Sequence, residues 1–80
     1  MERVITSDLT LDTLGLFCPL PIILTEKQMK EMSVGQVVEV LSDDVGIKQD
    51  MPIWCRQTGH LLIDLLEEGH VFRCYVRKLK

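Results

Sequence analysis

The chain has 80 residues, of which 46% are hydrophobic and 26% charged, with a formal net charge of −3. This length predicts one domain over residues 1–80, and the apolar content excludes a disordered chain. The negative net charge does not favour non-specific binding of nucleic acid by the surface as a whole.

The first half of the chain predicts a strand, a helix and a second strand. Residues 9–12 alternate apolar and polar side chains, which indicates a short strand with one buried face, and Gly15 marks the turn after it. Apolar residues at helical spacing predict a helix over residues 19–32. Gly35 supplies a left-handed residue in the connection that follows, and residues 36–42 are typical of a strand.

A second helix is predicted over residues 46–58. Asp43 and Asp44 break the preceding strand and offer side-chain oxygens that cap this helix. Together with Asp50 they could also suggest a metal or a basic partner, but capping is the simpler role. Pro52 leaves two alternatives. Either Asp50 caps a shorter helix that starts beside Pro52, or a first helical turn precedes Pro52 and the chain kinks there.

The last third predicts a hairpin, with strands over residues 60–66 and 70–78 and a tight turn over 67–69. The final strand alternates: Phe72, Cys74 and Val76 should face inward, and Arg73, Tyr75 and Arg77 outward. Right-handed crossovers place both helices on the same face of the sheet. We therefore expect an α/β (α+β) two-layer sandwich of order β-α-β-α-β-β, with a mixed four-stranded sheet and both helices on one face.

Cys18 lies between the first strand and the first helix, directly before Pro19. Proline favours the first helical position, and Pro21 falls in the first turn, where N–H groups have no helical partner. The N-terminal end of a helix carries partial positive charge, which stabilises a thiolate. We therefore predict a pKa for Cys18 below that of a free cysteine. Position alone equally allows a cysteine that merely fits the junction.

The segment Cys18-Pro19-Leu20-Pro21 resembles the Cys-Pro-x-Pro signature of the TusA/SirA/YedF family of small sulfur-carrier proteins. The resemblance covers nearly the whole chain. It includes Asp12-x-x-Gly15-x-x-Cys18, residues 35–44, Asp50-x-Pro52-x-Trp54 and Gly59-His60. Val45 departs from the family pattern, because many members have proline there. The family fold is the sandwich expected above.

The resemblance implies a persulfide carrier with sulfurtransferase-like chemistry rather than a stand-alone enzyme. Cys18 would accept sulfane sulfur from a cysteine desulfurase or a rhodanese and pass it to an acceptor protein. The pathway would be tRNA thiolation in some members, and molybdenum-cofactor, selenium or dissimilatory sulfur chemistry in others. Pro19, Pro21, Gly15 and Asp12 would support the site. No cofactor or metal is expected, and nucleic acid would be contacted at most indirectly.

The other two cysteines are interpreted as packing residues. Cys74 alternates with inward residues of its strand, and Cys55 lies on the second helix, where a resolving role stays open. A zinc set that joins Cys55 and His60 to Cys74 or His70 lacks the paired ligands of structural zinc sites. His60 and His70 are expected to face solvent or to cap rather than to act as bases.

The compartment is predicted to be the cytoplasm. The chain has an odd number of cysteines and no Cys-x-x-Cys motif, whereas a secreted disulfide-linked domain usually has an even number at higher density. The longest uncharged stretch, residues 13–25, is shorter than the ~20 residues of a membrane span, so direct membrane insertion is not expected. Residues 1–4 lack the basic and apolar regions of a signal peptide.

Two other functions remain open. One is a non-catalytic regulatory or interaction module, in which the open face of the sheet binds a partner and Cys18 is structural. A redox enzyme is disfavoured, because no second cysteine lies near Cys18 in the sequence. The basic residues gathered in the last eight positions indicate either an exposed strand protected by charge or a basic edge that meets an acidic partner; they are Arg73, Arg77, Lys78 and Lys80.

Overall fold

The structure is a computed structural model and describes residues 6–80. Its elements, in chain order, are β1 (Leu9–Asp12), α1 (Leu20–Glu31), β2 (Val37–Ser42), α2 (Ile47–Thr58), β3 (Leu61–Glu68) and β4 (Val71–Arg77). The predicted order is confirmed, and every predicted element lies within two residues of its expected ends. The hairpin turn falls on Gly69 and His70, because β3 continues to Glu68.

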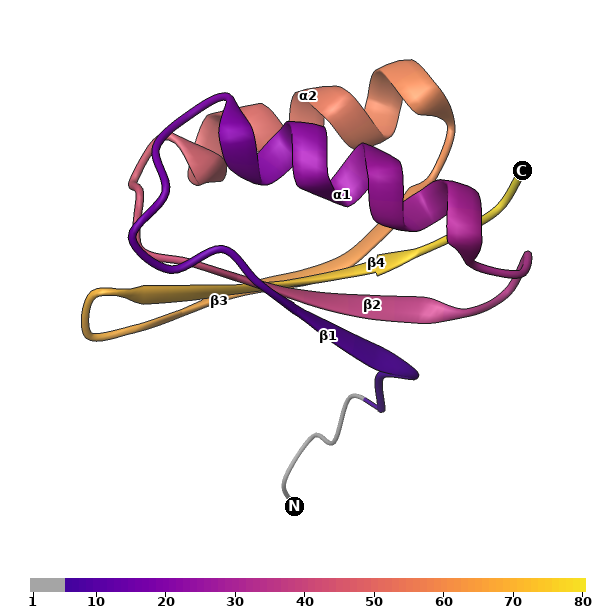
Figure 1. The fold of residues 1–80 in the computed structure, drawn as a ribbon, viewed down its shortest axis with the longest axis horizontal. Coiled ribbons are helices and arrows are strands. Elements are labelled where there is room, and N and C mark those ends of the chain that lie inside the picture. The colour runs from indigo at the N-terminus through magenta and orange to yellow at the C-terminus, as the bar shows by residue number, and fades with distance from the viewer. Residues whose placement is uncertain (1–5) are drawn as a thin grey trace.

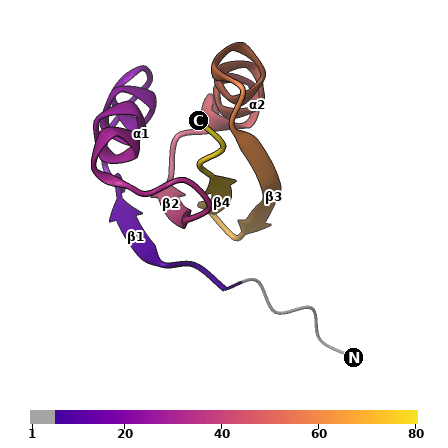
Figure 2. The same ribbon diagram turned by 90° about the vertical axis from the view of Figure 1, so that its right-hand side faces the viewer.

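The sheet has the strand order β1-β2-β4-β3. β1 runs parallel to β2, and β4 runs antiparallel to both of its neighbours, so the sheet is mixed as predicted. Figures 1 and 2 show both helices on the same side of this sheet. The interpretation of the basic last strand as an exposed edge is wrong, because β4 inserts between β2 and β3 and leaves β1 and β3 as the edges.

The core lies between the helices and the sheet. The register pairs Val38 with Val76 and Val40 with Cys74, and all four side chains are fully buried. They are covered by Met29 of α1, by Met32 directly after α1, and by four residues of α2: Ile47, Met51, Trp54 and Cys55. The predicted inward positions of β4 are therefore confirmed, and the apolar alternation of the strands accounts for the helix-covered face.

α2 is one helix that begins before Pro52. The alternative in which Asp50 caps a shorter helix is wrong, because Asp50 already lies in the first turn. Pro52 has no N–H, so the carbonyl of Lys48 loses its helical hydrogen bond. Lys48 is an exposed residue in the first turn of α2, where solvent can reach it. Among residues 6–80, neither this helix nor any other is long and apolar enough to cross a membrane.

Gly59 ends α2 in the left-handed conformation, with φ 84°, and its N–H donates to the carbonyl of Cys55 at 2.9 Å. A Gly59→Ala substitution should lower the free energy of unfolding by about 1–2 kcal/mol, because a Cβ disfavours this conformation. Urea denaturation measures the change. Gly46→Ala is the matched control: Gly46 has φ −59°, an ordinary helical value, so an equal loss there would contradict the prediction.

Candidate functional site

Cys18 lies at the edge of the sheet where both helices begin. β1 and β2 are parallel neighbours, so their carboxyl ends meet at this edge. The chain leaves β1 towards α1 and leaves β2 towards α2 on the same side (Figure 1). Residues 26 positions apart in the sequence, Cys18 and Asp44, therefore come into contact.

The loop before Cys18 is held by two carboxylates. Asp12 closes the turn after β1 by accepting the N–H of Leu14 at 2.9 Å. Gly15 adopts φ 81°, and its N–H donates to Asp43 at 3.0 Å. Asp43 thus binds this loop, which corrects the prediction that it caps the second helix.

Asp44 connects the backbone of Cys18 to the start of α2. One carboxylate oxygen accepts the N–H of Cys18 at 2.6 Å, and the other accepts the N–H of Gly46 at 3.1 Å. The prediction that the Asp44 side chain caps the second helix is wrong. The N-cap residue is Gly46, no side chain caps the first turn, and Asp44 bonds to the N–H of Gly46 just before the helix. The additional bond to Cys18 was not expected from the sequence.

The two prolines shape the beginning of α1. Pro19 is the N-cap residue, so the helix begins one residue later than predicted, and Pro21 occupies the first turn. The N–H of Leu20 is used within the loop, the N–H of Ile22 donates to the carbonyl of Pro19 at 3.1 Å, and proline has no N–H. The first turn of α1 therefore has no backbone N–H left to donate to a Cys18 thiolate.

The thiol of Cys18 donates a hydrogen bond from Sγ to the carboxylate of Asp50. This bond stabilises the protonated thiol, partial desolvation adds to the effect, and the negative charges of Asp50 and Asp44 oppose ionisation. Together they raise the pKa of Cys18 above its ordinary value. The predicted lowering of this pKa is wrong, because two carboxylates face the thiol and the prolines remove the donors that a helix N-terminus usually offers.

Asp50 is a site residue that the sequence reasoning missed. The sequence indicates a capping role for Asp50 or, less simply, a part in a metal site or a contact with a basic partner. In the structure its carboxylate contacts the sulfur of Cys18, 32 positions away. The signal was available in principle. Parallel pairing of the first two strands places the beginnings of both helices at one edge, so polar residues in the first turn of α2 are brought close to Cys18.

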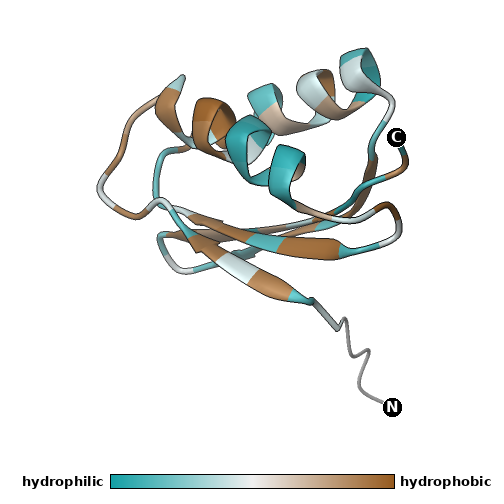
Figure 3. Cartoon of the chain, turned by 45° about the vertical axis from the view of Figure 1, so that its right-hand side comes forward, coloured by the Kyte–Doolittle hydropathy of each residue, from teal (hydrophilic) through white to brown (hydrophobic). Residues whose placement is uncertain are grey.

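The thiol is accessible and has apolar neighbours. It lines a cavity of about 280 Å³ with Pro19, Ile22, Asp50, Ile53, Trp54 and Gln57. Phe17 is 75% exposed, and Leu20 and Ile23 are also exposed. Figure 3 shows the first half of α1 as hydrophobic and the second half as hydrophilic. An exposed apolar rim of this kind is typical of a surface that docks another protein.

Cys55 and Cys74 are buried in the core, which confirms their interpretation as packing residues. Burial raises the pKa of Cys55 to about 11 and that of Cys74 to about 12. Both thiols are therefore protonated and enclosed at neutral pH, and Cys18 is the exposed one. Within residues 6–80, no group of three or more His, Cys, Asp or Glu side chains is placed to hold a metal ion.

Comparison with known proteins agrees with this arrangement. The family model described as sulfurtransferase TusA matches residues 9–78. The chain belongs to the TusA family. Its members are sulfur carriers, which implies that this TusA-family chain interacts with proteins that donate and accept sulfur.

Individual relatives cover most of the chain. Sulfur carrier protein TusA of Allochromatium vinosum is 41% identical over 71 residues, which is 89% of this chain and 93% of that protein. YrkI of Bacillus subtilis is 40% identical over 72 residues, 90% of this chain and 96% of YrkI. The crystal structure of a SirA-like protein from Desulfitobacterium hafniense superposes with a TM-score of 0.78 at 27% identity, covering 90% of this chain and 99% of that one. The TusA/SirA resemblance and the fold class are thus confirmed.

Proposed function

We propose that this protein relays sulfane sulfur as a persulfide on Cys18, between a donor enzyme and an acceptor protein in the cytoplasm. The observation that carries the proposal is the accessible Cys18 thiol at an open cavity with an exposed apolar rim. The chain is too small to enclose a substrate, and it presents one thiol to larger proteins. A cysteine desulfurase or a rhodanese is the proposed donor, and tRNA thiolation or a related sulfur or selenium pathway is the proposed destination.

The proposed transfer is a thiol–persulfide exchange. The Cys18 thiolate attacks the terminal sulfur of the donor's persulfide, which forms a bond between the two sulfurs and breaks the donor's own S–S bond. The donor leaves as a thiolate, and no net oxidation or reduction occurs. The proton of Cys18 is lost to solvent before the attack, because the hydrogen bond to the Asp50 carboxylate stabilises the protonated thiol and opposes this ionisation.

Burial of the other cysteines supports the carrier role. A persulfide is lost when a neighbouring thiol attacks it and closes a disulfide. Cys55 and Cys74 are enclosed in the core with raised pKa values, so neither presents a thiolate to Cys18. A loaded Cys18 would therefore keep its sulfur until a thiolate from another protein reaches it.

The proposal is tested by loading the protein with a cysteine desulfurase and cysteine, followed by intact mass spectrometry. We expect one added sulfur atom, which dithiothreitol removes. Cys18→Ser should abolish the adduct completely. Cys55→Ala is the matched control and should load as the wild type does, because Cys55 lies in the core.

Two outcomes would contradict the relay. One is the absence of an adduct with desulfurase, rhodanese and inorganic polysulfide alike, and the other is an equal adduct in Cys18→Ser. Full activity of Cys18→Ala in cells would instead favour the regulatory or interaction module in which Cys18 is structural.

A further inference from the structure

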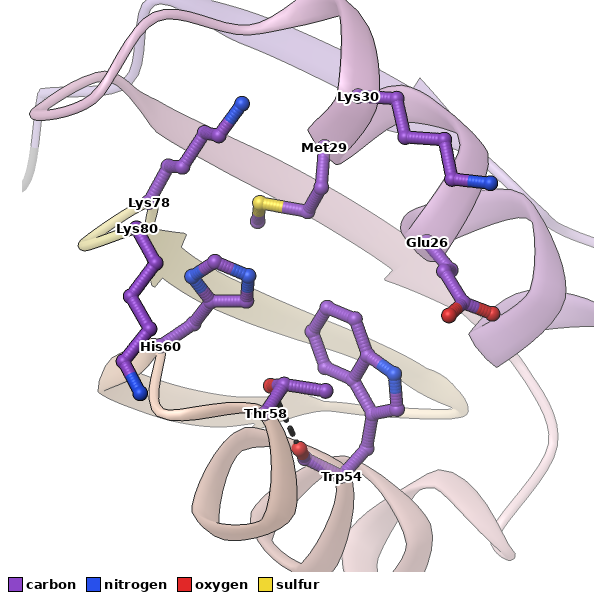
Figure 4. A pocket seen from close by; sticks show the side chains of 8 residues that line it. All are labelled: Glu26, Met29, Lys30, Trp54, Thr58, His60, Lys78 and Lys80. Carbon is purple, nitrogen blue, oxygen red and sulfur yellow. Dashed lines mark hydrogen bonds between the residues drawn. The ribbon is translucent and has the colours of Figure 1, made fainter.

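A second cavity, of about 210 Å³, is lined by residues of both helices and by residues near the C-terminal end of the chain. It is formed by the second halves of α1 and α2, by His60 before β3 and by two residues after β4 (Figure 4). Cys18 does not line it. Trp54 lines both this cavity and the one at Cys18, so the two cavities share this residue.

The floor of this second cavity is apolar and aromatic. Met29 and Trp54 are both buried residues of the core. The ring of His60 lies 5.6 Å from that of Trp54, and Figure 4 shows it between the indole and the side chains of Lys78 and Lys80. The Nδ1 of His60 accepts the N–H of Leu79 at 3.2 Å, so the neutral ring carries its proton on Nε2. The floor thus offers flat apolar surface and a hydrogen-bond donor.

The rim of the second cavity is basic. Lys30, Lys78 and Lys80 line it, and of the described lining residues one is acidic, Glu26. Lys78 donates from Nζ to the carbonyl of Met32 at 2.7 Å, which fixes its ammonium group and leaves two of its three N–H groups for a ligand. This concentration of positive charge contrasts with the net charge of −3 for the whole chain.

Lys80 is placed by the end of α2. Its side chain lies against Gly59, where a Cβ would come within 2.8 Å of Nζ. The pKa of His60 is lowered by desolvation first, and then by Lys78 and Lys80, which agrees with a positive local field. Donors on the rim and in the floor outnumber acceptors, so the complementary ligand carries acceptors and negative charge.

The size and charge of the second cavity select among possible ligands. Pockets for drug-sized molecules and cofactors usually measure about 300–1,000 Å³. A cavity of about 210 Å³ suits one large side chain better than a nucleotide. A nucleic-acid strand would also need a longer basic surface, whereas the neighbouring cavity is lined by Asp50, and Asp44 contacts Cys18 there.

We propose that this cavity anchors an acidic segment of a partner protein, with one large apolar side chain between Trp54 and Met29 and flanking carboxylates at the lysines. This inference rests on the proposed function in one respect: the partner that binds here is taken to be a sulfur donor or a sulfur acceptor. Because Trp54 lines both cavities, the same partner can hold this anchor while it presents its sulfur to Cys18. A second contact of this kind raises the effective concentration of the partner at the thiol.

The test uses Trp54, the single tryptophan of the chain, as a fluorescence probe in the full-length protein. The ligand is the capped peptide acetyl-Asp-Glu-Phe-Glu-Asp-amide. We expect a saturable change in emission that weakens as salt rises. Lys80→Glu should weaken the binding by about fivefold, since it replaces attraction by repulsion at the rim. Lys27→Glu makes the same charge change at an exposed position of α1 outside the cavity and should bind as the wild type does.

Cys18→Ser should bind the peptide normally, so failure of the sulfur relay and failure of this site give different results. Replacing the peptide's phenylalanine by alanine should weaken binding, as the apolar anchor requires. The proposal is overturned if no saturable change occurs, or if Lys27→Glu weakens binding as much as Lys80→Glu. It is also overturned if the alanine peptide binds equally well, or if a single-stranded oligonucleotide binds more tightly with the same dependence on Lys80.

Discussion

The Asp50→Asn variant should have a lower pKa at Cys18 than the wild type and should react severalfold faster with iodoacetamide near neutral pH. The thiolate is the reactive form, and a raised pKa keeps its population low. Asparagine removes the negative charge that opposes ionisation and can donate an N–H to the thiolate. The change therefore favours the ionised form in both respects.

The measurement is the rate of alkylation as a function of pH, with the thiolate absorbance as a second readout. The inflection in the rate should move to lower pH in Asp50→Asn. Asp43→Asn is the matched control: it removes the same charge from the same edge, but Asp43 bonds to Gly15 and does not contribute to the shift at Cys18. Unchanged inflection in Asp50→Asn, or an equal shift in Asp43→Asn, would show that the thiol–carboxylate contact does not set this pKa.

The same carboxylates have a consequence for the proposed relay. A persulfide on Cys18 would carry its negative charge next to Asp50 and Asp44, and like charges disfavour the ionised form. We expect the free carrier to be a protonated, slow nucleophile, which protects it from reaction with small thiols and oxidants. Asp50→Asn should then gain reactivity with iodoacetamide and with small disulfides alike, and lose this protection.

The fold followed from the sequence because its signals were local and mutually consistent. Alternation along β4, helical spacing in α1 and the turn at Gly35 each identify an element without knowledge of the others. Strand order was harder to predict. The insertion of β4 between β2 and β3 depends on pairing between distant segments, which no single stretch of sequence specifies, and the exposed-edge interpretation of β4 failed for that reason.

The site was predictable in its position and not in its electrostatics. The Cys18-Pro19-Leu20-Pro21 segment places the thiol at the beginning of α1, as the structure shows. The pKa depends on Asp50, which approaches from another helix, and on which N–H groups remain free after the prolines are counted. Such effects arise from the packing of α1 beside α2 rather than from the local sequence, so a helix-dipole argument alone gave the wrong sign.

The packing of α2 should be sensitive to the Met51→Ala substitution, which is expected to lower the free energy of unfolding by about 2–5 kcal/mol. Met51 is fully buried in the core, and truncation removes its contacts and leaves a cavity. A domain of this size typically has only about 4–12 kcal/mol of stability in total, so much of it would be lost. Urea unfolding measures the change as a lower midpoint at unchanged slope.

Met51 also determines where Asp50 lies, because the two are adjacent in α2 and burial of Met51 orients the helix on the sheet. Met51→Leu keeps most of the volume and should cost less than about 1.5 kcal/mol. Under native conditions Met51→Ala should also lower the pKa of Cys18 towards its ordinary value as the contact with Asp50 loosens, while Met51→Leu should leave it raised. If Met51→Ala is as stable as Met51→Leu, the side chain of Met51 does not stabilise the core as proposed. If Met51→Ala is destabilised but the pKa of Cys18 is unchanged, Asp44 and the loop before Cys18 suffice to hold the site without Met51.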